Sequence, residues 1–436
     1  MSKKICVVGL GYIGLPTAVM LAKSGYSVIG VDININKINN IKNKNIDTNE
    51  NNLKEYLEEV IDSKKLIAQR DVVESDVYIL CVPTPIVEKE GKKKCDLSCV
   101  ISAVDSIKPH LKDGDLLIIE STVPPNTTEE IYKKLKKDGK NIYMAYCPER
   151  VLPGKIIEEL VYNDRIIGGV DKKSSELAME IYKSFVKGNI YLTDCKTAEM
   201  VKLMENIYRD VNISLANEFA KICNDININV WEAIDLANKH PRVNILKPGP
   251  GVGGHCISVD PWFIISNENI KKENCKLIKT GREINDSMPK YVANIVVEEL
   301  KYYNIKNPKI GIMGITYKGN VDDTRESPAK SVIDNLIKKG CNIKLYDPYS
   351  KVFDYPLDSF EETIKDSDAL LFLTDHKVFN NYDEDTLRYI FNLMRNKIVI
   401  DTKNIIDRNL WEKVGFTVKL LGNGRDWNIF NCQKKE

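Results

Sequence analysis

The sequence predicts an α/β protein in which two Rossmann-like parallel-sheet domains are joined by a helical central region. Short Val- and Ile-rich runs alternate with helical patterns in the first and last thirds of the 436 residues, which is typical of βαβ units and a parallel sheet. Long stretches of the middle third carry apolar residues at three- and four-residue steps, as helices do. We therefore expect domains at residues 1–196, 197–304 and 305–436.

The strands expected in the first domain are short apolar runs. They are Lys3–Val8, Ser27–Ile33, Val77–Val82, Leu116–Glu120 and Ile142–Tyr146. Between the second and third of these runs lies the Asn-rich stretch Asn34–Asn52, for which the composition predicts a solvated helix and loop.

The central region is expected to hold three helices and a Pro/Gly-rich loop at Pro248–Gly254. The helices cover Thr197 to about Cys223, Trp231–Asn238 and about Cys275–Tyr303. The strands of the last domain are expected at Lys309–Ile315, Asn342–Asp347, Ala369–Thr374 and Lys397–Asp401. The runs that begin at Lys4 and Lys309 resemble each other, which supports two similar α/β halves, although any two parallel-sheet domains share strand chemistry.

The composition excludes several classes of protein. The 63 Lys and Arg balance 62 Asp and Glu, so a non-specific nucleic-acid binder is not expected. Eleven Cys without a CxxC pair and only four His fit neither a disulfide framework nor a zinc module, and they indicate a reducing, cytoplasmic location without a bound metal. The uncharged run Ile5–Ala22 resembles a signal peptide, but three glycines and Pro16 interrupt it, so no membrane partner is expected.

The first strand leads into a dinucleotide fingerprint, Gly9-x-Gly11-x-x-Gly14. In such a turn the first glycine allows a tight bend, the second lets the backbone approach a pyrophosphate, and the third packs closely. The intervening Tyr12 and Ile13 belong to the same phosphate-binding segment. Asp32 ends the second strand and would accept hydrogen bonds from a ribose while repelling a 2′-phosphate, which favours NAD over NADP. The alternative is a glycine turn in a ligand-free domain.

The most unusual segment runs from Lys247 to Trp262 and is rich in Gly and Pro before Cys256. Such a loop, which includes Gly253, brings backbone N–H groups close to a small ligand. Cys256 is a candidate nucleophile with Asp260 four residues later, although it is one of eleven cysteines. His255 is expected to pack locally, because no partner at metal-ligand spacing is present.

Several polar residues have the spacing or position of a ligand site. Lys202, Asn206 and Arg209 share one helix face, which suits an oxyanion and a phosphate, although a solvated stripe is the alternative. Other candidates follow expected strands, where ligands bind in open parallel sheets. They are Thr84, Thr122, Glu149, Tyr317, Lys318 and Arg325. Each could be a solvated loop residue, but together they describe a cleft for an anionic ligand.

Motifs along nearly the whole chain resemble the UDP-glucose/UDP-N-acetylhexosamine 6-dehydrogenase family. They are GLGYIGLP, STVPP, CPERVLPG, the K-x-x-x-N helix, GPGVGGHCISVDPW and GITYKGNVDDTRESP. The resemblance implies nucleotide-binding α/β domains at both ends and a helical dimerisation region, hence a homodimer or higher homo-oligomer. It also implies a four-electron oxidation of a sugar C6 alcohol to a carboxylate by two NAD in turn.

The resemblance further implies roles for individual residues. Cys256 would carry a thiohemiacetal and then a thioester, Lys202 with Asn206 would stabilise oxyanions, and Asp260 would activate water or tune the thiol. Thr122 and Glu149 would position water or the sugar, and Thr84, Thr122 and Arg325 would contact the cofactor. The residues implied around the substrate are Arg150, Val151, Lys202, Asn206, Arg209, His240, Arg242, Gly253, Tyr317 and Lys318. Among these, Arg242 resembles an arginine that reaches the substrate of a neighbouring subunit.

The chain departs from the UDP-glucose members at Pro153 and Gly154, where those members carry a second glutamate, so the carboxylate that activates water stays open. His255 and the segment after Cys256 resemble the N-acetylhexosamine branch, with the C2 configuration of the sugar undetermined. Other hypotheses are a two-electron hydroxyacid dehydrogenase, which needs no Cys256, a Y-x-x-x-K epimerase, and a non-catalytic nucleotide-sugar sensor.

Overall fold

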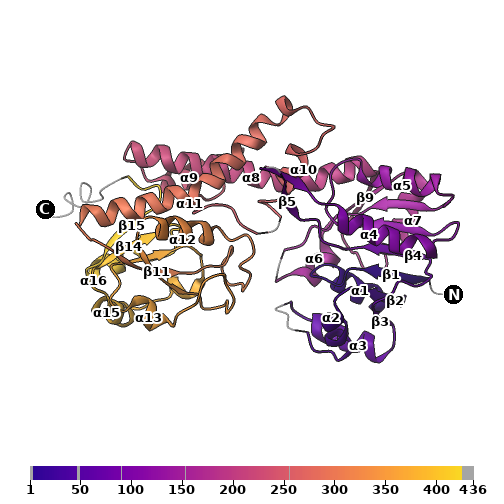
Figure 1. Ribbon diagram of the computed structural model, residues 1–436, viewed down its shortest axis with the longest axis horizontal. Helices are drawn as coiled ribbons and strands as arrows, with labels where there is room; N and C mark the ends of the chain where they lie inside the picture. The colour runs from indigo at the N-terminus through magenta and orange to yellow at the C-terminus, as the bar shows by residue number, and fades with distance from the viewer. Residues whose placement is uncertain (1–2, 47–49, 90, 153, 255, 425–436) are drawn as a thin grey trace. The chain divides into compact units, whose positions relative to one another are not determined.

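A computed structural model describes residues 3–46, 50–89, 91–152, 154–254 and 256–424 (Figure 1). Pro153 and His255 therefore lie outside the described residues. The chain folds into two compact units. The first comprises Met1–Glu205 and Trp262–Ile270, and the second comprises Asn206–Pro261 and Lys271–Glu436.

The first unit contains an eight-stranded sheet of order β10-β9-β8-β7-β4-β1-β2-β3. Its pairs are parallel except for β8 with β9. The strands are β1 Lys4–Val8, β2 Ser27–Val31, β3 Leu66–Gln69, β4 Val77–Leu80, β7 Leu116–Ile119, β8 Tyr143–Tyr146, β9 Arg165–Gly169 and β10 Ile190–Asp194. The order reverses between β1 and β4, and this switch point is where open α/β sheets bind ligands.

Both faces of this sheet are covered, because alternate residues of a strand point to opposite faces. Ile5 and Val7 lie in a core with α1 (Gly14–Lys23), whereas Cys6 and Val8 lie in a second core with α4 (Ser98–Ile107). The other helices are α2 Ile35–Lys42, α3 Leu53–Asp62, α5 Thr127–Lys137, α6 Ile156–Tyr162 and α7 Lys172–Tyr182. A small hairpin pairs β5 Ile86–Lys89 with β6 Lys92–Cys95.

The second unit contains a parallel sheet of order β12-β11-β13-β14-β15, whose switch point lies between β11 and β13. The strands are β11 Lys309–Met313, β12 Asn342–Tyr346, β13 Ala369–Phe372, β14 Ile398–Asp401 and β15 Thr417–Leu420. The helices around it are α12 Pro328–Lys338, α13 Phe360–Ile364, α14 Lys377–Asn380, α15 Glu384–Leu393 and α16 Arg408–Val414.

The long helices of the middle third are α8 Cys195–Asp225, α9 Val230–Ala237 and α11 Lys276–Tyr302. The boundary between the two units falls inside α8. A short helix, α10 Asp260–Ile265, follows the Cys256 loop. No helix in the described part of the chain is long and apolar enough to cross a membrane.

The predicted fold class is confirmed, and every expected strand is present with its ends trimmed by a few residues. The strands β3, β9, β10 and β15 and the β5–β6 hairpin were not predicted from the sequence. These strands are short, and β10 is an edge strand with exposed apolar residues, Tyr191 and Leu192, that break a buried pattern. The Asn-rich stretch contains α2 as predicted, with Asn34 capping it by accepting the N–H of Lys37.

A buried ion pair joins α8 to α11 within the second unit. The guanidinium of Arg282 lies 2.5 Å from Asp210 and also pairs with Asp286. The amide of Asn285 donates to both the carbonyl and the carboxylate of Asp210 at 2.9 Å. Burial raises the pKa of Asp210, and the charge of Arg282 opposes that rise. This pairing fixes how the two long helices pack, because a buried charge without a partner is costly.

We expect Arg282→Met to lower the free energy of unfolding of the second unit by about 3–5 kcal/mol, because it leaves Asp210 buried without its cation. Chemical denaturation followed by tryptophan fluorescence measures this loss. Arg388→Ala is the control, since its pair with Glu384 lies on the surface of α15 and contributes at most about 1 kcal/mol. Equal unfolding midpoints for the two variants would contradict the expectation.

Candidate active site

The three glycines of the fingerprint occupy three different environments at the end of β1. Gly9 has a φ of 94°, and a Cβ there would lie 2.5 Å from the carbonyl oxygen of Cys81. A Cβ on Gly14 would lie 1.8 Å from the carbonyl oxygen of Gly9, whereas a Cβ on Gly11 would meet nothing within 4 Å. The first and third glycines therefore pack against protein, and the second faces space in which a phosphate fits.

Asp32 lies directly after β2 and is 7% exposed. Its carboxylate accepts the N–H groups of Leu10 and Asn34 and the ammonium of Lys37, each at 2.9 Å. No described side chain caps the start of α1, where Ile13 is the N-cap residue. A free helix N-terminus beside an anchored carboxylate fits a dinucleotide, with the phosphates at the helix and a ribose at the acid.

Other predicted residues of the first unit line the same sheet edge. Thr84, Thr122 and Glu149 follow β4, β7 and β8, which are neighbours in the sheet. Glu149 is buried, and the two threonines are half-buried. The hydroxyl of Tyr12 donates to Glu50 at 2.8 Å, so Tyr12 ties the glycine loop to the chain before α3.

Lys202 of α8 reaches Glu149, since its ammonium donates to the carbonyl oxygen of Glu149 at 2.6 Å. The guanidinium of Arg150 forms a two-pronged ion pair with Glu205 and also donates to the carbonyl of Asp164 at 3.0 Å. Val151 follows it and is half-buried. The structure thus brings Lys202 and Glu149 together, while Arg150 is held by a neighbouring carboxylate.

A buried charge cluster that was not predicted from the sequence contacts the carboxylate of Glu149. Arg165, at the start of β9, lies 3.1 Å from Glu149 and 3.5 Å from Glu120. The hydroxyl of Tyr182 donates to Glu120 at 2.6 Å, and the ring of Tyr182 stacks on Arg165 at 4.5 Å. Burial raises the pKa of Glu120, while the charge of Arg165 lowers it and that of Glu149 raises it. The one sign of this cluster in the sequence was the position of Glu120 at the end of an expected strand.

In the second unit, hydrogen bonds join Asn206, Asp260 and Cys256. The buried amide of Asn206 donates to the buried carboxylate of Asp260 and accepts from the guanidinium of Arg209. The N–H of Asp260 donates to the carbonyl of Cys256 at 2.8 Å. The structure therefore places an acid and an amide next to the turn that carries the half-buried thiol.

The glycine loop before Cys256 packs on the segment after β11. A Cβ on Gly253 would lie 2.8 Å from the Cβ of Tyr317, and a Cβ on Gly254, whose φ is 82°, would lie 2.9 Å from the Tyr317 ring. Burial raises the pKa of the Tyr317 hydroxyl, and the charges of Asp323 and Cys256 add to that rise. Arg325 is paired with Asp323 at 2.7 Å, and this hydrogen bond raises its pKa. Tyr317, Arg325 and Cys256 are thus within electrostatic reach of one another.

His240 and Arg242 follow α9. Both are exposed, and their side chains are 3.4 Å apart. The residues that the structure describes include no group of three or more His, Cys, Asp or Glu that could hold a metal ion.

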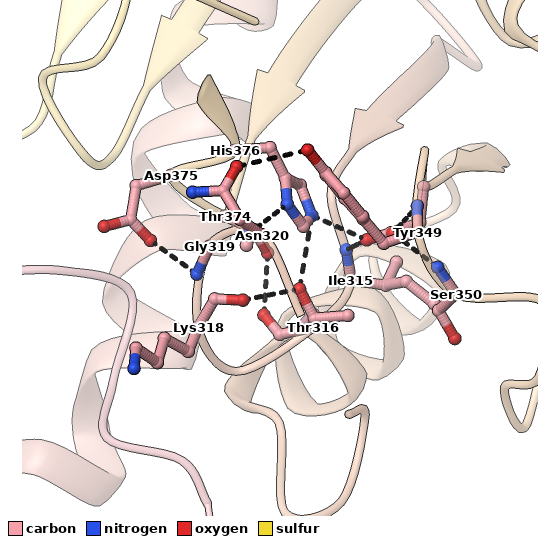
Figure 2. A network of polar contacts seen from close by, with 12 residues as sticks. Ile315, Thr316, Lys318, Gly319, Asn320, Tyr349, Ser350, Thr374, Asp375 and His376 are labelled. Carbon is pink, nitrogen blue, oxygen red and sulfur yellow. Dashed lines mark hydrogen bonds and ion pairs between the residues drawn. The ribbon is translucent and has the colours of Figure 1, made fainter. Parts of the chain in front are cut away.

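A further polar network at the ends of β11, β12 and β13 was missed by the sequence analysis (Figure 2). Its centre is His376, which contacts Asp347, Thr316 and the backbone of Asn320. The one available signal was the position of Asp347, which directly follows β12 as Asp32 directly follows β2. Lys318 lies in the loop that this network holds.

Family models match three successive parts of the chain. Residues 3–186 match the NAD binding domain, residues 196–287 the central domain, and residues 311–408 the UDP binding domain of the UDP-glucose/GDP-mannose dehydrogenase family. The chain belongs to this family. The predicted enzyme class, a dehydrogenase of nucleotide sugars, and the predicted cofactor, NAD, are confirmed.

Individual relatives match over nearly their full lengths. A UDP-N-acetyl-D-mannosamine dehydrogenase of Methanococcus aeolicus is 60% identical over 98% of this chain and 97% of its own. An NDP-N-acetyl-D-galactosaminuronic acid dehydrogenase of Ralstonia nicotianae is 41% identical over 92% and 96%. The solved structure of a UDP-D-ManNAc dehydrogenase from Pyrococcus horikoshii matches with a TM-score of 0.89 and 43% identity, covering 97% of this chain and 99% of that one.

We expect Asp32→Ala to raise the KM for NAD roughly 10- to 100-fold, because charge-assisted hydrogen bonds to a ribose contribute about 1.5–3 kcal/mol. The preference for NAD over NADP should fall, since the repulsion of a 2′-phosphate is removed. Steady-state kinetics with each cofactor measure both effects, and Asp62→Ala, at the end of α3, is the control. An unchanged KM for NAD would exclude Asp32 from ribose binding.

Glu120 should make the stability of the first unit depend on pH. Because burial raises its pKa above the ordinary 4.5, the folded state keeps this proton at pH values where the unfolded state has released it. The contribution is complete below about pH 4.5 and is lost as the pH rises through the raised pKa. Glu120→Gln, which resembles the protonated acid, should flatten the decline in stability that denaturation measures as the pH rises above about 4.5. An identical decline in both proteins would contradict this expectation.

Proposed function

We propose that the protein oxidises UDP-N-acetyl-D-mannosamine at C6 to UDP-N-acetyl-D-mannosaminuronate in two steps, with Cys256 as the nucleophile. The observation that carries this proposal is the set of hydrogen bonds that links Cys256, Asp260 and Asn206 beside a glycine loop that packs on Tyr317. The names of full-length relatives support the sugar. The domain division at residues 1–196, 197–304 and 305–436 is part of the proposal.

The proposed chemistry uses a thiol to hold the aldehyde between the two oxidations that lead to the carboxylate. Bound NAD supplies the hydride acceptor, once for each of two oxidations. The thiolate of Cys256 adds to the aldehyde of the first oxidation and forms a thiohemiacetal, which keeps the aldehyde from escaping. Loss of a second hydride gives a thioester, and water releases the acid and the thiol. A thiolate of this kind requires a reducing compartment, so the proposal includes a cytoplasmic location.

Charged and polar groups of the chain are assigned to the developing charges. Lys202 stabilises the oxyanions and exchanges protons, with Asn206 assisting it. Asp260 orients water or the thiol, which its hydrogen bonds to Asn206 and to the Cys256 turn support. Glu149 and Thr122 orient water or the sugar, and the contact of Lys202 with the Glu149 carbonyl supports a shared role.

Several further residues are proposed as substrate or cofactor contacts. Lys318 and Arg209 are cations for the diphosphate, and Tyr317 and Gly253 form the support of the Cys256 loop. Arg150 and Val151 are proposed near the sugar, and Arg325 near the cofactor. The ion pairs of Arg150 with Glu205 and of Arg325 with Asp323 require each arginine to share or exchange its partner when a ligand binds.

A homodimer or higher homo-oligomer is proposed from α8. Tyr208, Leu215 and Ile222 recur at steps of seven on this helix and are each more than 40% exposed. An apolar stripe of this kind is typical of a helix that packs against a partner. The exposed pair His240 and Arg242 is then available to a neighbouring subunit's substrate.

A panel of UDP-sugars tests the proposed function. UDP-N-acetyl-D-mannosamine should be oxidised with two NADH formed per sugar, more efficiently than its N-acetylglucosamine and N-acetylgalactosamine counterparts or UDP-glucose. The amount of NADH and the mass of the product measure the outcome. One NADH per sugar would exclude the four-electron reaction, and a better substrate elsewhere in the panel would replace the proposed sugar.

The Cys256→Ser variant is the mechanistic arm of the same test. It should form uronate at least about 10³-fold more slowly than the original protein, because an alcohol is a far weaker nucleophile than a thiolate. Cys275→Ser is the matched control, since Cys275 is a buried thiol at the end of the 3-10 helix Lys272–Cys275. Normal acid production by Cys256→Ser would remove the thiol from the mechanism.

A further inference from the structure

The loop Thr316–Asn320 lies at the switch point of the second sheet, between the ends of β11 and β13. It carries Tyr317 and Lys318. Because Gly253 packs on the Cβ of Tyr317 and Gly254 on its ring, the conformation of this loop also sets the support of the segment that leads to Cys256.

His376 is completely buried behind this loop (Figure 2). Its Nδ1 accepts the backbone N–H of Asn320 at 2.9 Å. A backbone N–H can only donate, so Nδ1 is unprotonated and Nε2 carries the ring proton. Nε2 lies 3.0 Å from the carboxylate of Asp347 and 3.2 Å from the hydroxyl of Thr316. The imidazole therefore has one defined tautomer, with its acceptor toward the loop and its donor toward Asp347.

Asn320 closes the loop in a conformation that needs such support. Its φ is 60°, in the left-handed region. Its side-chain oxygen accepts the N–H of Lys377 at 2.9 Å and the hydroxyl of Tyr349 at 3.3 Å. The preceding N–H, of Gly319, donates to the carboxylate of Asp375 at 3.1 Å. The β13 end and the β12 end thus hold the loop from two sides.

The same turn in the first unit is built differently at one point. Asp32 accepts the N–H of Leu10, which follows Gly9, at 2.9 Å. Asp347 accepts the N–H of Ile315, which follows Gly314, at 2.8 Å. The further side-chain partner of Asp32 is the partly exposed ammonium of Lys37, whereas that of Asp347 is the buried ring of His376. Asp32, which we expect to accept hydrogen bonds from a ribose, therefore has a counterpart, Asp347, whose carboxylate is bonded to the ring of His376 instead.

We propose that His376 is a positioning residue for the nucleotide sugar. By accepting the Asn320 N–H at Nδ1, it holds the loop Thr316–Asn320 in the conformation that presents Lys318 to the diphosphate. This proposal rests on the proposed substrate role of Lys318, but not on the identity of the sugar or on the chemistry at Cys256.

Two variants separate the two ring nitrogens. An asparagine at this position can place its amide oxygen near the site of Nδ1, whereas a glutamine reaches the site of Nε2 instead. We expect His376→Ala to raise the dissociation constant of UDP, measured by titration calorimetry, roughly tenfold, which is the usual effect of losing one buried hydrogen bond. His376→Asn should recover most of the affinity, and His376→Gln should not.

Hydrogen exchange of the peptide that contains residues 314–322 is the second measurement. Its amides should exchange faster in His376→Ala and His376→Gln than in His376→Asn. The KM for the nucleotide sugar should rise with the dissociation constant of UDP, while the KM for NAD stays within about twofold. His110→Ala, at a histidine of the first unit whose carbonyl accepts the hydroxyl of Tyr78, is the matched control.

Thr316→Val provides a milder variant if His376→Ala does not fold. It removes the hydroxyl that lies beside Nε2 and donates to the carbonyl of Lys318 at 3.0 Å, and it should weaken UDP binding by a smaller factor. Folded variants with unchanged UDP affinity and exchange would overturn the proposal, as would equal behaviour of His376→Asn and His376→Gln. UDP binding is measured without turnover, so this test still decides the role of His376 if the protein does not oxidise the proposed sugar.

Discussion

Both sheets close their first βαβ turn with the same hydrogen bond, from the N–H after a glycine to a carboxylate that follows the second strand. The glycines, Gly9 and Gly314, have φ values of 94° and 87°, which side chains rarely tolerate. The carboxylates, Asp32 and Asp347, are each less than a tenth exposed and so must be satisfied by donors. The glycine and the acid therefore determine each other, and the loops at the ligand-binding edge extend from this turn.

The two turns differ in the side chain that supplies a further hydrogen bond to the carboxylate. Asp32 keeps a partly exposed lysine as its partner, which leaves the edge of the first sheet open to a dinucleotide. Asp347 is completed by the ring of His376, and the neighbouring loop instead supports Tyr317 and the glycine segment before Cys256. The same construction thus recurs in the NAD binding domain and in the UDP binding domain, with a different side chain bonded to the acid in each.

Much of this arrangement could be predicted from residue order. Alternating apolar runs indicated parallel sheets, and the positions of Thr84, Thr122 and Glu149 after strands predicted a common edge, because neighbouring parallel strands end at the same side. The partners of these groups could not be predicted. Arg165 begins a short strand with no special pattern, yet it lies between Glu120 and Glu149 because the fold pairs β9 with β8.

The sequence by itself determined the α/β class, the nucleotide turn and the loop of Cys256, because periodicity and motif spacing are properties of short segments. Only the tertiary structure decided which polar groups satisfy one another: Asn206 with Asp260, Arg282 with Asp210, and His376 with Asp347. These partners are 54, 72 and 29 residues apart, so no local pattern relates them. They are selected when packing excludes water, because a buried polar or charged group then requires a partner wherever the strand order places one.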